Sequence, residues 1–230
     1  MKQYFVLCAV LVLSFSCEMP VKTSGNNGYE SSSTGQIEKT EDLFVRQGGE
    51  ENKYILDVND KKYIKENGYT VWTEIGVNAS SSFEKISCSM NKEYGDTDAG
   101  YGIIFLFSDE ENKEYLLTVL INNKQKYCIG RLKDNSFSLI YNWTQTESLA
   151  GGNTGNGNKI SVEYVTEGSH KDKFLLKING KEETYFSDSE NMRPVFKNTK
   201  WGYAAVISPF ENFNTSRVRI TYRKQDGESE

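Results

Sequence analysis

Carboxylate pairs are the first chemistry to look for in this 230-residue chain, which carries 32 Asp and Glu residues. Retaining hydrolysis of a glycosidic bond needs two carboxyl groups about 5 to 5.5 Å apart, usually delivered by acidic residues that alternate on one strand. No Glu-x-Asp-x-x-Glu run occurs, and the nearest pair, Asp96 and Asp98, lies in a glycine-flanked turn. This pair is either a weak calcium site built from hard oxygens or a solvated loop, and the loop is the favoured interpretation. The sequence therefore predicts no enzyme, no metal and no cofactor.

The single histidine and the glycine-rich stretch offer little further chemistry. His170 lies between two expected strands without a nucleophile or an orienting group nearby, so we expect an exposed loop residue. Residues 151–158 are rich in glycine but lack the Lys-Ser/Thr pair of a phosphate-binding loop.

Two tryptophans are candidate ligand contacts, because aromatic faces bind sugar rings. Trp72 has the opposite parity to the apolar strand neighbours Val71 and Ile75, which places it away from the core. Trp143 ends its expected strand beside a polar segment and is suited to the rim of a site. The alternative for both is packing in the core, and for Trp201, beside a glycine, packing is the preferred interpretation.

The amino terminus has the layout of a signal peptide, with Lys2 followed by an uncharged run and then small residues. The run is roughly 12 residues long, short of the roughly 20 that a membrane-spanning helix needs. Its end, Leu13 to Cys17, resembles the lipobox of bacterial lipoproteins, which implies lipidation of Cys17. It departs from the usual pattern because Leu13 lies four positions before the cysteine and Phe15 is bulky. The alternative is cleavage near Ser16 without lipid, and either outcome predicts export.

If Cys8 leaves with the leader and Cys17 carries lipid, Cys88 and Cys128 remain. Export permits a disulfide between them, and buried free thiols are the alternative.

The chain is expected to divide into four parts. Residues 1–16 form the signal peptide and 17–50 a lipidated cysteine with a disordered tether rich in Gly, Ser and Asn. Residues 51–225 form one domain, and 226–230 form a flexible tail.

Alternating apolar and polar residues predict an all-β, antiparallel sandwich. Val218, Ile220 and Tyr222 alternate with charged or polar neighbours. The runs 101–107 and 115–121 are apolar at both parities and should be interior strands, while Asn179-Gly180 predicts a tight hairpin. The net charge of -5 disfavours nucleic acid as a partner.

The order of the expected strands between residues 69 and 223 resembles the concanavalin A-like (laminin-G-like) jelly roll. The motifs behind the resemblance are a glycine-led strand, an "L-x-V/I-N-G" hairpin and a "G-x-x-A" strand: Gly100 to Phe105, Phe174 to Gly180, and Trp201 to Ala205. These motifs mark the fold and not a function.

The combined features predict a lipoprotein anchored in the cell envelope, in the outer membrane or at the cell surface rather than the inner membrane. Its non-catalytic jelly roll is expected to bind a glycan or a surface protein. The alternatives are a carbohydrate-active hydrolase on the same fold and a structural subunit of an envelope complex.

Overall fold

The structure is a computed structural model that describes residues 36–40, 42–48, 53–58, 69–78, 85–108, 114–133, 136–151, 157–187, 195–207 and 218–225. The described residues form strands and turns only, which confirms the predicted all-β class. None of them belongs to a helix long and apolar enough to cross a membrane. The predicted leader, Cys17 and the tail 226–230 lie outside the described residues.

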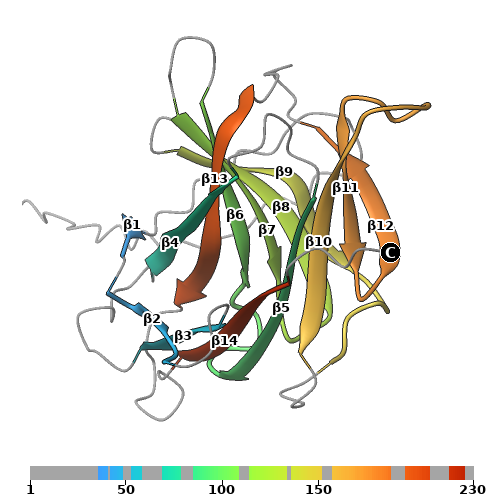
Figure 1. Ribbon diagram of the computed structural model, residues 1–230. Coiled ribbons are helices and arrows are strands. Elements are labelled where there is room, and N and C mark those ends of the chain that lie inside the picture. Colours follow the sequence, from blue (N-terminus) through green and yellow to red (C-terminus); the bar gives the residue numbers. More distant parts are fainter. Residues whose placement is uncertain are drawn as a thin grey trace, which may run out of the picture.

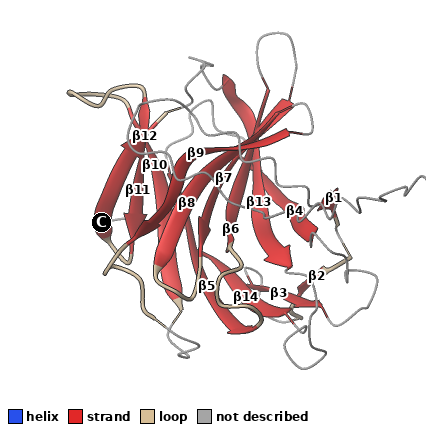
Figure 2. Cartoon of the chain, turned by 180° about the vertical axis from the view of Figure 1, so that it is seen from behind, coloured by secondary structure: helices blue, strands red, loops and turns tan. Residues whose placement is uncertain are grey.

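Within the ranges just given, fourteen strands build two seven-stranded sheets. Sheet A has the order β1-β4-β13-β6-β7-β8-β9 and sheet B the order β12-β11-β10-β5-β14-β3-β2. Figure 1 looks onto β10, β11 and β12 of sheet B, and Figure 2 looks from behind onto β7, β8 and β9 of sheet A. The strand bounds are β1 Gln36–Lys39, β2 Phe44–Arg46, β3 Lys53–Val58, β4 Tyr69–Asn78, β5 Lys85–Tyr94, β6 Tyr101–Ser108, β7 Glu114–Ile121, β8 Lys126–Lys133, β9 Ser136–Gln145, β10 Asn158–Val165, β11 Lys173–Ile178, β12 Lys181–Phe186, β13 Val195–Ile207 and β14 Val218–Gln225.

The core lies between the two sheets and is supplied by one parity of each strand. Val119 of β7 and Ile220 of β14 are fully buried in it, together with the stacked rings of Tyr203 and Tyr222, whose centroids are 4.4 Å apart. All neighbouring strands pair antiparallel except β1 and β4, so the predicted antiparallel sandwich is confirmed. Both runs that are apolar on two faces, β6 and β7, are interior strands of sheet A as predicted.

The tight hairpin between β11 and β12 also agrees with the prediction. Asn179 and Gly180 have φ values of 50° and 82°, the left-handed region that a two-residue hairpin turn requires. The Asn179 side chain then ties this turn to neighbouring loops, since its Nδ2 donates to the Ser148 carbonyl at 2.7 Å.

The predicted domain boundary at residue 51 is too late. Strands β1 and β2, which lie within the segment predicted as a tether, pair with β4 and β3 respectively. Their signal is weak because each is only three or four residues long and Phe44 is the one core side chain that β2 supplies. The folded part therefore includes Gln36.

The candidate disulfide between Cys88 and Cys128 does not form, because both thiols are free and buried. Cys88 points from β5 into the core, whereas Cys128 points from β8 away from the core. Sheet A therefore separates the two sulfur atoms. Burial raises the pKa of the Cys88 thiol to about 12 and also raises that of Cys128, so both stay protonated at neutral pH.

Candidate functional site

The outer face of sheet A, on the side away from the core, carries a second apolar cluster. Along β7, Val119 points into the core and the next residue, Leu120, points outward with 4% of its surface exposed. Outward-facing residues of a sheet that faces water are normally polar, so this face is unusual. We call it the A face, and its members are Ile104, Leu116, Leu120, Cys128 and Ala204, with Leu139, Trp143 and Val206 packed against them.

Trp143 is the large aromatic side chain of the A face. It comes from β9, is half-buried, and lies against the backbone that leads into β6. A Cβ atom added to Gly100 would lie 2.9 Å from Trp143 Cη2 and 3.2 Å from the Leu120 side chain. Gly100 is therefore glycine because the indole occupies the space that a larger side chain would need. The ring is seated over an apolar floor and keeps part of its surface open.

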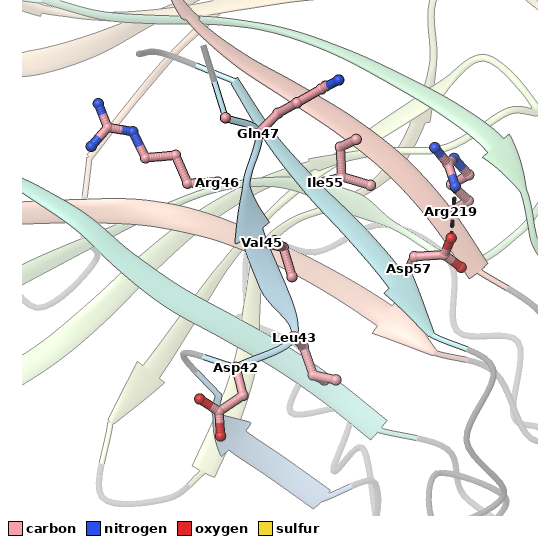
Figure 3. A pocket seen from close by; sticks show the side chains of 9 residues that line it. Asp42, Leu43, Val45, Arg46, Gln47, Ile55, Asp57 and Arg219 are labelled. Carbon is pink, nitrogen blue, oxygen red and sulfur yellow. Dashed lines mark hydrogen bonds and ion pairs between the residues drawn. The ribbon is translucent and has the colours of Figure 1, made fainter. Parts of the chain in front are cut away.

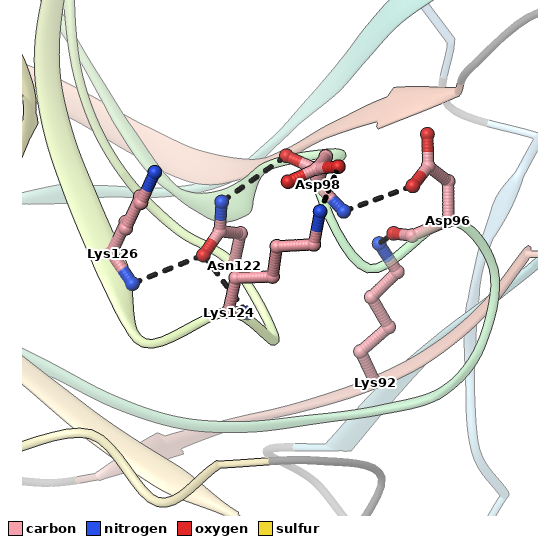
Figure 4. A network of polar contacts seen from close by, with 6 residues as sticks. All are labelled: Lys92, Asp96, Asp98, Asn122, Lys124 and Lys126. Carbon is pink, nitrogen blue, oxygen red and sulfur yellow. Dashed lines mark hydrogen bonds and ion pairs between the residues drawn. The ribbon is translucent and has the colours of Figure 1, made fainter. Parts of the chain in front are cut away.

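A polar margin borders the A face where the loops β5–β6, β7–β8 and β9–β10 meet. Asn122 Oδ1 accepts hydrogen bonds from the backbone N–H groups of Lys124 and Lys126, at 3.1 and 3.0 Å. Lys124 forms an ion pair with Asp98 across the two loops (Figure 4). Gln145, from the same strand as Trp143, donates to the Lys124 carbonyl at 3.3 Å. Planar amides and charged groups are thus fixed beside the aromatic ring.

The β5–β6 loop is organised around a buried lysine. Lys92 is 1% exposed, and its ammonium donates to the carbonyls of Asp96 and, at 2.9 Å, of Ala99 (Figure 4). Burial lowers the pKa of Lys92 to about 8, although the negative charges of Asp96 and Asp98 oppose this shift. The loop that delivers Gly100 to Trp143 is therefore held by an internal ammonium ion.

The same contacts describe the surroundings of the weak calcium candidates. Asp96 Oδ1 accepts a hydrogen bond from the Asp98 N–H at 2.9 Å, and Asp98 Oδ2 pairs with Lys124. Lys92 occupies the backbone carbonyls that would otherwise face a cation. Among the described residues, no three His, Cys, Asp or Glu side chains gather as a metal site would require. The Asp98 carboxylate is thus paired with Lys124, and Lys92 binds the backbone carbonyls of the loop.

The other residues singled out by the sequence lie elsewhere. Trp72 of β4 lies directly opposite Ala204, a member of the A face, in the backbone register of β4 and β13. The side chain of Trp72 lies outside what the structure describes. His170 lies in the expected loop but is half-buried, because its ring stacks on Tyr185 with centroids 3.9 Å apart. The prediction of an exposed histidine is wrong on this point, since sequence gave no sign of the stacking partner on β12.

The outer face of sheet B differs from the A face because its charges are paired. A cavity of about 420 Å³ opens beside β2, over Val45 and Ile55 (Figure 3). At one end Arg219 pairs with Asp57 at 2.7 Å and with Glu93 at 3.1 Å. Since both carboxylates are engaged with one guanidinium, this cavity offers fewer free charged groups to a ligand than its lining suggests.

Sequence reasoning missed Lys92, Lys124 and the apolar character of the A face. The signal for the last was present, since β6 and β7 are apolar at both parities. Such a run was interpreted only as an interior strand. Its outward-facing parity also indicates a second apolar cluster, whose central side chains are 5% exposed or less.

Solved structures of known proteins share this fold. A glycoside hydrolase family 16 endo-glucanase from Bacteroides ovatus aligns with a TM-score of 0.50 and 8% identity, over 86% of this chain and 93% of that one. A β-1,3-1,4-glucanase (lichenase) from a mouse hindgut metagenome has a TM-score of 0.50 and 9% identity, covering 86% and 88%. LamAcat from Zobellia galactanivorans gives 0.50 and 9%, covering 86% of each chain. No protein-family model and no curated protein matches the sequence.

At these identities the likeness shows a jelly-roll β-sandwich, which confirms the expected fold. It contradicts the prediction that the chain is not an enzyme, because the same sandwich belongs to hydrolases. The missing Glu-x-Asp-x-x-Glu run cannot exclude catalysis. Carboxylates from different strands of one sheet face can meet in space, and a search along one strand does not detect them.

Proposed function

We propose that this protein recognises glycans on the A face and that Trp143 is the residue on which a sugar ring stacks. The observation that carries the proposal is the seating of the half-open Trp143 indole over Gly100 and Leu120. A ring fixed in this way loses little conformational freedom when a ligand binds.

The chemistry of the margin complements the ring. A sugar has an apolar face of C–H groups and a periphery of hydroxyl groups, so it needs an aromatic surface with hydrogen-bonding groups beside it. Trp143 supplies the surface, while the exposed side chains of Gln145 and of the Asp98–Lys124 pair supply polar groups that their own contacts hold in place. The likeness of the fold to glucanases supports a carbohydrate as the ligand.

Hydrolysis of the bound glycan is the second candidate, favoured by the fold shared with two glucanases over 86% of this chain. It would require two carboxyl groups over the A face. The acidic positions in the strands of sheet A are Glu38, Glu74 and Glu114. Turnover of lichenan or laminarin that is lost in Glu74→Gln or Glu114→Gln would support this activity.

The cellular setting belongs to the same proposal. The leader and Cys17 favour an exported protein held at a membrane of the cell envelope by a lipid on that cysteine. Mass spectrometry of the mature amino terminus should find a diacyl or triacyl modification on Cys17. An unmodified Cys17 in the mature protein would remove the anchor from the proposal and leave the glycan site untouched.

The test of glycan recognition compares two aromatic substitutions in the full-length protein. Trp143→Ala should abolish binding to the glycans that the wild type retains on a glycan array, and Trp143→Tyr should keep part of it. Tyr185→Ala is the matched control, because Tyr185 is a half-buried aromatic residue of sheet B. Equal binding by wild type and a folded Trp143→Ala protein would refute the proposal.

A further inference from the structure

We propose that the glycan bound on the A face is anionic, with carboxylate or sulfate groups, and that the Lys126 ammonium pairs with that charge. This inference rests on the proposed function, since it concerns the same face. It goes further by naming the ligand class and a residue that determines specificity.

Lys126 lies on the same face of sheet A as Trp143, and its backbone is held in place. It lies directly opposite Gln145 in the β8–β9 pair and has the same parity as Cys128 of the A face. Asn122 holds its backbone from both sides, because Oδ1 of Asn122 accepts from the Lys126 N–H and the Asn122 N–H donates to the Lys126 carbonyl at 2.9 Å. The stem of Lys126 is half-buried, and its ammonium extends away from these contacts (Figure 4).

The Lys126 ammonium has no carboxylate partner among the described residues, and neighbouring cations differ in this respect. Lys124 pairs with Asp98, and the Lys92 ammonium is buried against backbone carbonyls. On sheet B, Lys85 and Lys177 both pair with Glu163. In a protein of net charge -5, an ammonium on the face of Trp143 that pairs with no carboxylate of the described residues is a local feature that attracts a negative group.

A second observation on the same face also points to a ligand. Thr118 is 4% exposed, and its Oγ1 has no hydrogen-bond partner in the part of the chain that the structure describes. It lies in β7 opposite Ile104 on one side and Gly130 on the other. Leaving a buried hydroxyl unpaired is unfavourable. A sugar hydroxyl or an anionic oxygen lying on the A face would accept its hydrogen bond.

The test measures affinity of the full-length protein for polygalacturonate, which carries carboxylates, for heparin, which carries sulfates as well, and for neutral laminarin. Wild-type protein should bind one of the anionic polymers at least tenfold more tightly than laminarin, and added NaCl should weaken only that binding. Lys126→Met should lower the anionic affinity about tenfold, the range of a hydrogen bond to a charged group. Lys126→Arg should restore most of it.

Lys177→Met is the matched control, because Lys177 is a half-buried lysine on the other sheet that already has a carboxylate partner. Its affinities should equal those of the wild type. Binding to laminarin that matches or exceeds binding to both anionic polymers, with Lys126→Met unchanged, would overturn this inference and leave the proposed function intact. Absence of binding to any glycan would instead refute the proposed function, on which this inference depends.

Discussion

The two sheets differ in the side chains that they turn away from the core. On sheet B, Glu163 accepts from Lys85 at 3.1 Å and from Lys177 at 2.9 Å. Burial raises the pKa of Glu163, but the hydrogen bonds from Lys177 and Lys85 outweigh this and leave its pKa below the usual value. Lys85, Lys177 and Arg219 of this sheet each pair with a carboxylate within the protein.

The A face is apolar in its centre, with an indole lying over it and, at its margin, the Lys126 ammonium, which pairs with no carboxylate in the described part of the chain. The five central side chains are 5% exposed or less, and Leu139, Trp143 and Val206 at their edge are half-buried, so the open apolar surface of this face lies at Trp143 and these two neighbours. The comparison shows that the basic side chains Lys85, Lys177 and Arg219 of sheet B have their partners within the protein. The A face combines a half-buried indole with a basic side chain, which is the combination that we propose for ligand binding.

The largest effect is expected where the strands of sheet A approach each other most closely. A Cβ atom at Gly102 would lie 1.9 Å from the Val119 carbonyl oxygen, so Gly102→Ala forces β6 and β7 apart. The free energy of unfolding should fall by more than about 3 kcal/mol, as for other strongly overpacked sites. Urea denaturation measures it, with Gly48→Ala as the control, because nothing lies within 4 Å of a Cβ at Gly48.

A second prediction sets one residue of each face against the other. Leu120→Ala removes a buried side chain from the A face and should cost about 2 to 4 kcal/mol. Glu163→Gln breaks partly exposed ion pairs on sheet B and should cost less than about 1 kcal/mol. Similar costs for the two variants would mean that the A face is not an apolar layer in solution.

A smaller effect should appear in the pH dependence contributed by Lys92. Its pKa is about 8 in the folded protein and 10.5 for an ordinary lysine, so between these limits the unfolded chain binds more protons. Stability therefore rises with pH over this window and has no slope from Lys92 below pH 8. At about 1.4 kcal/mol per pKa unit, the total contribution is at most about 3 kcal/mol.

The contribution of Lys92 is isolated by subtracting the free energy of unfolding of Lys92→Met from that of the wild type at each pH. The subtraction is needed because buried Cys88, with a pKa raised to about 12, makes stability fall as the pH rises above 9. The wild type should gain stability relative to Lys92→Met between pH 8 and pH 10. A constant difference over that range would show that Lys92 is not buried as an ammonium ion.

Sequence alone predicted the sandwich because alternation is a local property. Val218, Ile220 and Tyr222 each lie two residues apart, and all three are buried in the core. Strand register is not local, and it decides that Cys88 and Cys128 lie on different sides of sheet A. It also brings Trp143 of β9 to Gly100 before β6. Neither relation can be read from the spacing of residues along the chain.

The loop lysines were missed for a related reason. Asn91-Lys92-Glu93 looks like a polar strand end, and only the return of the chain through Asp96 and Ala99 gives the Lys92 ammonium two carbonyls to bind. Asp96 and Asp98 were recognised as a polar cluster, but their partner Lys124 is 26 residues away from Asp98 in the sequence. The interacting group could therefore be identified only after the two loops were placed together.

The most direct test of glycan recognition on the A face uses protein labelled with 5-fluorotryptophan, whose three tryptophans give separate ¹⁹F NMR signals. Trp143→Phe assigns the Trp143 signal, and Trp201, which is 6% exposed in the core, serves as the internal reference. Titration with a glycan that the protein binds should shift the Trp143 signal progressively and leave the Trp201 signal in place. Binding that saturates while the Trp143 signal does not move would contradict the account.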